Sequence, residues 1–246
     1  MQRAPATAAP RVFVDIGAHD GSSIAMAVEG GYAFDRLISV EPDPDMVAHL
    51  EKRFEAEVAS GRYRVAPVGL SDRIGTARLF GDNSGGGASI VAGKFAPEDR
   101  TSREIALIDW PALLDQYGLR GARLWVKINA EGAEVPIVES ILAEGGSGIE
   151  SLVVDFDIVK SPFGAWAKWR TLRALRASGI PFRLAEEVFV KHGPRPRLHN
   201  WFSSFADLRD PPIPPRPAPL SKLIRMHYLD ACSAIGIRLD MFKRRK

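Results

Sequence analysis

The sequence predicts an α/β fold in which helices cover both faces of a mostly parallel sheet. Short runs of consecutive apolar residues alternate with segments of helical periodicity along most of the chain, the order expected of β-α units. The first apolar run ends in glycine directly before a helical segment, as at a ligand-binding turn of such a sheet. The chain has 246 residues, of which 46% are hydrophobic and 26% charged. These values are typical of a folded globular domain and exclude a disordered chain.

The first half of the chain shows three apolar runs without polar alternation, which is typical of parallel strands buried on both faces. The predicted strands are 11–18, 36–42 and 63–71, with a short additional strand at 76–80. Helical spacing of apolar residues predicts helices at 21–29 and 45–59. The segment 81–94 has five glycines in fourteen residues and predicts a mobile loop.

The second half continues the alternation and then changes character. The predicted strands are 104–110, 123–130 and 149–159, and the predicted helices are 111–117, 133–143 and 165–177. The last helix is expected to turn Trp166, Trp169, Leu172 and Leu175 inward. Two further strands, 182–192 and 198–205, predict a terminal hairpin that adds an antiparallel strand at one edge.

Charge divides the chain unevenly and suggests four regions. Residues 1–189 carry a net charge of −5, whereas residues 190–246 carry +8. An acidic body argues against a nucleic-acid-binding protein. We expect a leader at 1–10, one domain at 11–209, a spacer at 210–219 with six prolines, and a basic amphipathic helix at 220–246. In that helix Ile224, Tyr228, Ala231, Ile235 and Leu239 would share one side.

Several kinds of protein are excluded by composition. The one cysteine, Cys232, allows no intrachain disulfide and no zinc site of cysteine ligands. The five histidines show no metal-ligand spacing. We expect no metal, although Asn129, Asp155 and Asp157 would supply oxygen ligands to a divalent ion. No apolar run is long enough for a membrane span, and no secretory signal precedes the first strand. These features favour a cytoplasmic protein.

Polar residues follow three of the predicted strands, at the edge where ligands bind in such sheets. Gly17 and Gly21 form a GxxxG spacing, and His19 occupies the place of the glycine that admits a pyrophosphate in dinucleotide-binding proteins. A pyrophosphate is therefore disfavoured. Glu41, at the end of the second strand, suits hydrogen bonds to ribose hydroxyls, and Asp72 suits an adenine amino group. Each signal also fits plain strand–turn–helix architecture.

Four motifs resemble the FkbM-type methyltransferase family: VDIGAHDG, SVEPDP, GLSDRIGTARLF and WVKINAEGAEVPIVES. The likeness covers roughly residues 11–160. It implies a Rossmann-like class I methyltransferase fold with a seven-stranded sheet. It also implies S-adenosyl-L-methionine as cofactor and methylation of a hydroxyl on a sugar, glycoside or natural product, with no nucleic acid as partner.

The resemblance also implies a set of site residues. The candidate cofactor-binding residues are Asp15, Gly17, Ala18, His19, Gly21, Glu41, Pro42, Ser71, Asp72 and Asn129. The sequence departs from the family pattern at His19, where asparagine is usual, and at Asn129, where aspartate is commoner. The second departure weakens any role at this position that needs a negative charge.

Methyl transfer to oxygen requires alignment of the hydroxyl and usually removal of its proton. The catalytic candidates are Glu131, Asn129, Lys127, Asp155 and His19, with Asp157 as a further base candidate. Asp155 and Asp157 would share one face of a strand, or one of them would cap a helix or pair with a cation. Lys127 would pair with Glu131, Glu134 or Asp15, since an unpaired buried ammonium is costly. The glycine-rich loop and Trp110 would flank the acceptor.

Alternatives remain open at this level. A catalytically inactive methyltransferase-fold scaffold is supported by Asn129, and a nicotinamide-dependent oxidoreductase is disfavoured by the GxxxG spacing. The C-terminal helix would dock on its own domain, form a homodimer, or contact a membrane surface weakly.

Overall fold

The computed structural model describes residues 8–81, 88–90, 102–157, 164–188 and 194–210, and the single positions 212, 220, 221, 224, 228, 231 and 232. The start of the predicted leader, most of the predicted glycine-rich loop and proline spacer, and most of the predicted C-terminal helix lie outside the described residues. The position of the glycine-rich loop beside an acceptor therefore stays a prediction.

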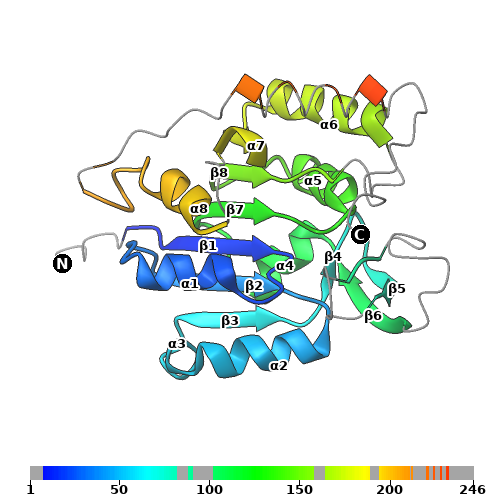
Figure 1. Cartoon of the computed structure of the whole chain (residues 1–246). Coiled ribbons are helices and arrows are strands. Elements are labelled where there is room, and N and C mark those ends of the chain that lie inside the picture. The colour runs from blue at the N-terminus through cyan, green and yellow to red at the C-terminus, as the bar shows by residue number, and fades with distance from the viewer. Residues whose placement is uncertain are drawn as a thin grey trace, which may run out of the picture.

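Six parallel strands form the central sheet, in the order β3-β2-β1-β7-β8-β9 (Figure 1). Their bounds are β1 Arg11–Ile16, β2 Arg36–Val40, β3 Tyr63–Ala66, β7 Arg123–Ile128, β8 Ile149–Val154 and β9 Phe182–Leu184. The chain adds β2 and β3 on one side of β1 and later returns to place β7 on its other side. The strand order therefore reverses between β1 and β7, which is where such sheets bind ligands.

Helices cover both faces of this sheet (Figure 1). They are α1 Ser22–Glu29, α2 Pro44–Arg53, α3 Glu55–Ala59, α4 Trp110–Gln116, α5 Glu134–Ala143, α6 Gly164–Ser178, α7 Ala185–Val188 and α8 Pro194–Phe202. One apolar core joins the sheet to α4, α5 and α6, and a second joins it to α1, α2 and α8. Neighbouring residues of β7 serve opposite cores, because Trp125 belongs to the second and Val126 to the first.

A small second sheet lies beyond the carboxyl ends of the central strands (Figure 1). It contains β4 Gly69–Leu70, β5 Gly75–Phe80 and β6 Ser102–Ile108, in the order β4-β6-β5. The strand predicted at 63–71 is thus divided between two sheets. The division falls at Pro67, which has no N–H to donate to a strand ladder. In the β2–α2 connection the Asp43 carboxylate accepts from the Arg103 guanidinium of β6 at 3.0 Å, which ties the small sheet to the central one.

The predicted seven-stranded sheet with a terminal hairpin is wrong. The central sheet has six strands among the described residues, and α7 and α8 occupy much of the predicted hairpin. Leu198, Trp201 and Phe202 are buried at helical spacing against the aromatic rings of the second core. A short apolar run cannot by itself separate strand from helix, and here Pro194 supplies a favourable first helical position.

The predicted inward face of α6 is half wrong. Leu172 and Leu175 are buried, but Trp166 and Trp169 are 63% and 50% exposed. Residues spaced by three drift about 60° around a helix at each step, so the four predicted positions cannot share one face. Ala165, Lys168 and Thr171 complete the buried side of the helix.

Candidate functional site

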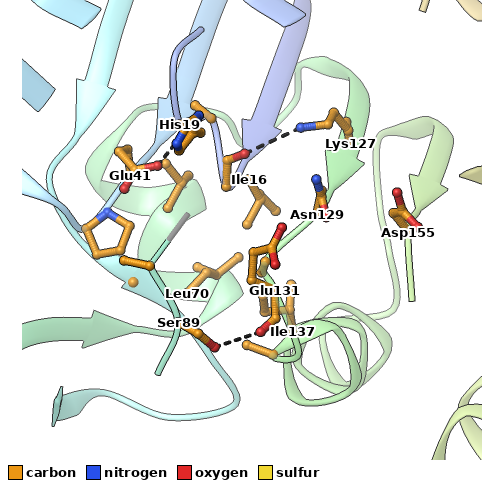
Figure 2. Close-up of a pocket in the computed structure, with 18 of the residues that line it drawn as sticks. Ile16, His19, Glu41, Leu70, Ser89, Lys127, Asn129, Glu131, Ile137 and Asp155 are labelled. Atoms are coloured by element: carbon orange, nitrogen blue, oxygen red, sulfur yellow. Dashed lines mark hydrogen bonds between the residues drawn. The ribbon is translucent and has the colours of Figure 1, made fainter. Parts of the chain in front are cut away.

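A cavity of about 450 Å³ opens at the carboxyl ends of β1, β2 and β7, beside the reversal of strand order (Figure 2). Of the residues singled out in the sequence, its lining contains Gly17, Ala18, His19, Glu41, Pro42, Lys127, Asn129, Glu131 and Asp155. The fold therefore brings together most of the predicted site. In Figure 2, Glu41, Asn129 and Asp155 lie around the upper part of the view, and Leu70, Ser89 and Ile137 lie below them.

The β1–α1 turn is fixed by two close approaches. Gly17 has a φ of 75°, and a Cβ there would lie 1.9 Å from the carbonyl oxygen of Asn129. Gly21 has a φ of 76°, and its Cβ would lie 2.6 Å from a methyl group of Leu50. Glycine is required at both positions by packing within the protein. At Gly17 the atom that approaches closely belongs to the backbone of Asn129, directly after β7.

Glu41 connects the ends of β1 and β2. One carboxylate oxygen accepts from the His19 N–H at 2.8 Å, and the other accepts from the Asp43 N–H at 3.0 Å. Burial raises the pKa of the Glu41 carboxyl, while these two N–H bonds act in the opposite direction. The side chain is 7% exposed and lines the cavity wall. It therefore offers a rigid acceptor at the end of β2.

Lys127 pairs with Asp15 across the β1–β7 register. Its ammonium donates to the Asp15 carboxylate at 2.7 Å and to the Gly17 carbonyl at 3.4 Å. This is one of the three partners expected from the sequence. Asp15 is fully buried, and burial raises the pKa of its carboxyl against the effect of Lys127. Lys127 lines the cavity, whereas Asp15 lies behind it and is not part of the lining.

The turn after β7 holds Glu131 in a rare conformation. Its φ is 54°, and His19 is the other non-glycine residue with a positive φ in the described part of the chain. Both line the cavity, and unfavourable backbone conformations often cluster at functional sites. The Ser89 hydroxyl donates to the Glu131 carbonyl oxygen at 2.7 Å (Figure 2).

Glu134 supports the same turn from the protein interior. One of its carboxylate oxygens accepts from the N–H of Ala130 at 3.0 Å and of Gly132 at 3.1 Å. The Glu134 side chain is buried and does not line the cavity. Burial raises the pKa of its carboxyl to about 7, although the backbone N–H donors lower it. Glu134 is thus a positioning residue for Glu131.

Asp155 and Asn129 follow two neighbouring strands and both line the cavity. The prediction that Asp155 and Asp157 share a strand face is wrong, because β8 ends at Val154. Asp155 is attached to β7 through its N–H, which donates to the Ile128 carbonyl at 2.9 Å. Asp157 is not among the cavity residues but lies close enough to raise the pKa of Glu134.

Besides Asp15, Gly21 and Asp157, three predicted residues are not part of the cavity lining. The Asp72 carboxylate accepts from the Ser71 hydroxyl at 3.0 Å, and neither residue belongs to the lining described above. Their role beside an adenine stays a prediction. Trp110 is fully buried in the core as the first residue of α4. The prediction that Trp110 flanks the acceptor is therefore wrong.

An apolar part of the cavity wall was not predicted. It is built largely from the small second sheet and α5, with the members Val68, Leu70, Leu79, Ile90 and Ile137. Ser89 and Ile90 belong to the segment 81–94, which was predicted to flank the acceptor, and Ser89 bridges to Phe80 of β5. Val68, Leu70 and Leu79 are distant in sequence from the motifs at the ends of β1 and β7.

Five N–H groups of the β1–α1 turn donate to protein oxygens. Those of Gly17 and Ala18 donate to the Val40 carbonyl, and that of Gly21 donates to the Ala18 carbonyl. The His19 N–H is held by Glu41, and the Ser22 N–H by the Asp20 carboxylate. This arrangement differs from a phosphate-binding turn, in which such groups point at the anion.

The cavity wall is rich in carboxylates. Asp20, Glu41, Glu131 and Asp155 contribute to the lining, and so does Lys127, whose ammonium pairs with Asp15. Asp20 in turn lies 3.9 Å from the Arg53 guanidinium. Among the described residues no group of three or more histidine, cysteine or acidic side chains is placed to hold a metal ion. The described helices include none of sufficient length and apolar character to cross a membrane.

Comparisons with known proteins give a distant likeness. No protein-family model and no curated protein matches the chain. Among solved structures the chain is similar to a methyltransferase FkbM from Methylobacillus flagellatus KT, with 17% identity and a TM-score of 0.45. The match covers 70% of this chain and 38% of that one, so this chain spans well under half of the other protein's length.

Proposed function

We propose that the protein is an S-adenosyl-L-methionine-dependent methyltransferase that acts on a hydroxyl of a small molecule such as a glycoside or natural product. The observation that carries the proposal is the carboxylate-lined cavity where the strand order reverses between β1 and β7. Its wall favours a cofactor that bears positive charge, as a sulfonium and an ammonium do. The four motifs that resemble the FkbM-type family border the same cavity.

The site argues against a nicotinamide dinucleotide. A pyrophosphate needs N–H groups that point at it from the β1–α1 turn, but those of Gly17, Ala18, His19, Gly21 and Ser22 donate to protein oxygens. The Asp20 carboxylate at this helix end would repel phosphate as well. An oxidoreductase of the dinucleotide-binding kind is therefore disfavoured by structure as well as by the GxxxG spacing.

The residues present fit the proposed cofactor. Glu41 would accept from the ribose hydroxyls, and the apolar wall around Leu70 would cover the base. When bound, S-adenosyl-L-methionine supplies a methyl group on a sulfonium, which an oxygen nucleophile can accept. Glu131 would take the proton from the acceptor hydroxyl, because its turn is fixed by Ser89 and Glu134 and its carboxylate borders the cavity. Asp155, at the end of the neighbouring strand, would orient the hydroxyl.

Two measurements test the proposal. Calorimetry should detect binding of S-adenosyl-L-methionine and S-adenosylhomocysteine but not of NAD. Incubation with cofactor labelled on its methyl group should label members of a panel of glycosides and hydroxylated natural products. Binding without labelling of any member would favour the inactive scaffold instead, and binding of NAD alone would overturn the proposal.

Variants separate the two proposed roles. Glu41→Gln should weaken S-adenosylhomocysteine binding by about tenfold, because a hydrogen bond to a charged group is lost. Glu131→Gln should lower kcat by about 100-fold with unchanged cofactor affinity, as expected for loss of a base. Glu150→Gln is the control, because Glu150 lies near the amino end of β8 beside Arg123. It should change neither cofactor affinity nor kcat.

A further inference from the structure

Exposed apolar side chains gather on α6 and the C-terminal segment. The large apolar side chains exposed in the described part of the chain are Val58, Ile74, Trp166, Trp169, Leu220, Ile224 and Tyr228. Trp166 and Trp169 begin α6, and their indole rings meet edge to face with centroids 6.3 Å apart. Two exposed tryptophans on adjacent turns of one helix are unusual for a surface that faces only water.

The same helix is strongly basic. Arg170, Arg173 and Arg176 are exposed, and the guanidinium of Arg173 lies over the Trp169 ring at 5.8 Å. The stretch 158–183 contains six basic residues and no acidic one, whereas the rest of residues 1–189 carries a net charge of −11. Positive charge in this acidic body is thus concentrated around α6. We call Trp166, Trp169, Arg170, Arg173 and Arg176 the tryptophan–arginine face.

We propose that the tryptophan–arginine face docks the protein on an anionic lipid surface. Indole rings settle at the boundary between headgroups and acyl chains, and arginines attract anionic headgroups. The residues of this face belong to α6, whereas the weak membrane contact predicted from the sequence concerned the C-terminal helix. The proposal does not depend on the proposed function.

Charge also decides between lipid and a second copy of the chain. In a symmetric dimer built on this face the arginines of the two copies would meet one another. An anionic surface instead attracts this face and repels the acidic remainder of residues 1–189. The described helices cannot cross a membrane, so contact would be peripheral.

The start of α6 lies near a cavity residue along the chain. Asp155 lines the cavity, and the ring of the next residue, Phe156, lies 5.9 Å from the Lys168 ammonium on the buried side of α6. The tryptophans occupy the first turns of α6 on its exposed side. The helix follows β8 from the carboxyl edge of the sheet (Figure 1).

Flotation of the full-length protein with vesicles tests the proposal. Vesicles of phosphatidylcholine mixed with phosphatidylglycerol should carry the protein, and vesicles of phosphatidylcholine alone should carry much less. Trp166→Ser with Trp169→Ser should abolish most of the binding. Arg170→Gln and Arg173→Gln should each weaken vesicle binding by roughly fivefold. Added salt should weaken vesicle binding of the unaltered protein. All four changes are on the exposed side of α6, so thermal unfolding should be unaltered.

The matched controls are exposed residues elsewhere. Val58→Ser with Ile74→Ser removes other exposed apolar side chains, and Arg78→Gln removes an exposed arginine of β5. These variants should bind vesicles like the unaltered protein. Equal losses in the control and α6 variants, or equal binding to both kinds of vesicle, would overturn the proposal. So would light scattering that shows a dimer abolished by the tryptophan changes, with no vesicle binding.

Discussion

The Glu134 carboxylate accepts from the Gly132 N–H with both of its oxygens, each at 3.1 Å. This contact lets a buried acid shape the turn that carries Glu131, without itself reaching the cavity. It links the ionisation of Glu134 to the stability of the fold, because burial raises the pKa of this carboxyl to about 7 from an ordinary value of 4.5.

The first prediction concerns Glu134→Gln and pH. Between pH 4.5 and about 7 the carboxyl is protonated in the folded protein and ionised in the unfolded chain. Folding therefore takes up a proton, and the stability that this group contributes falls as pH rises, by up to about 3 kcal/mol. Glutamine does not titrate. The free energy of unfolding of the unaltered protein, relative to that of the variant, should fall across this range in urea titrations.

Glu139→Gln is the control for this experiment, because Glu139 lies on the exposed side of the same helix, α5. It should leave the pH dependence of unfolding as it is. A pH-independent difference between the unaltered protein and Glu134→Gln would contradict the prediction.

Asp15→Asn should destabilise the protein by about 3 kcal/mol. The change leaves the Lys127 ammonium beside a neutral amide in a buried setting, and breaking one side of a buried pair is costly. Asp35→Asn is the comparison, since its pair with Arg11 is exposed and should contribute less than about 1 kcal/mol. Urea unfolding measures the loss of stability in both variants. Losses of similar size would contradict the idea that burial makes the Asp15–Lys127 pair the more costly one to break.

Gly17→Ala should be far more damaging than Gly121→Ala, although both glycines have a φ of 75°. A Cβ at Gly121 meets nothing within 4 Å, so only the conformational cost of about 1–2 kcal/mol applies. At Gly17 the Cβ would also overlap the Asn129 carbonyl and separate the ends of β1 and β7. Thermal unfolding should show the difference, and equal melting temperatures for the two variants would refute it.

Ser89→Ala should lower turnover while leaving S-adenosylhomocysteine affinity within about twofold, because the lost bond of about 1 kcal/mol supports Glu131. Ser204→Ala removes a bond of the same kind and length, from its hydroxyl to the Trp201 carbonyl at 2.7 Å, away from the cavity. That control should keep full turnover. A loss of cofactor affinity equal to the loss of turnover in Ser89→Ala would show that the bond serves binding instead.

The sequence by itself determined the alternation of strands and helices and the strand ends at which the polar motifs lie. Apolar runs without alternation predict buried parallel strands, and carboxyl ends of parallel strands meet at one edge. Glu41, Glu131 and Asp155 follow such strand ends, and Asn129 was expected from the family resemblance; all four line the cavity. For Lys127 the sequence left three possible acidic partners, Glu131, Glu134 and Asp15.

Tertiary structure decided what local patterns leave ambiguous. The run at 198–205 suits a strand or a helix, and burial of Trp201 and Phe202 against Phe13 made it a helix. Asp15 became the partner of Lys127 because parallel register places them opposite each other on β1 and β7. Leu70 and Leu79 of the wall come from the second sheet, and the hydrogen bond from Ser89 to the Glu131 carbonyl joins residues 42 positions apart. Such long-range contacts leave no periodic signal in the chain, so only the folded arrangement shows that they complete the cavity.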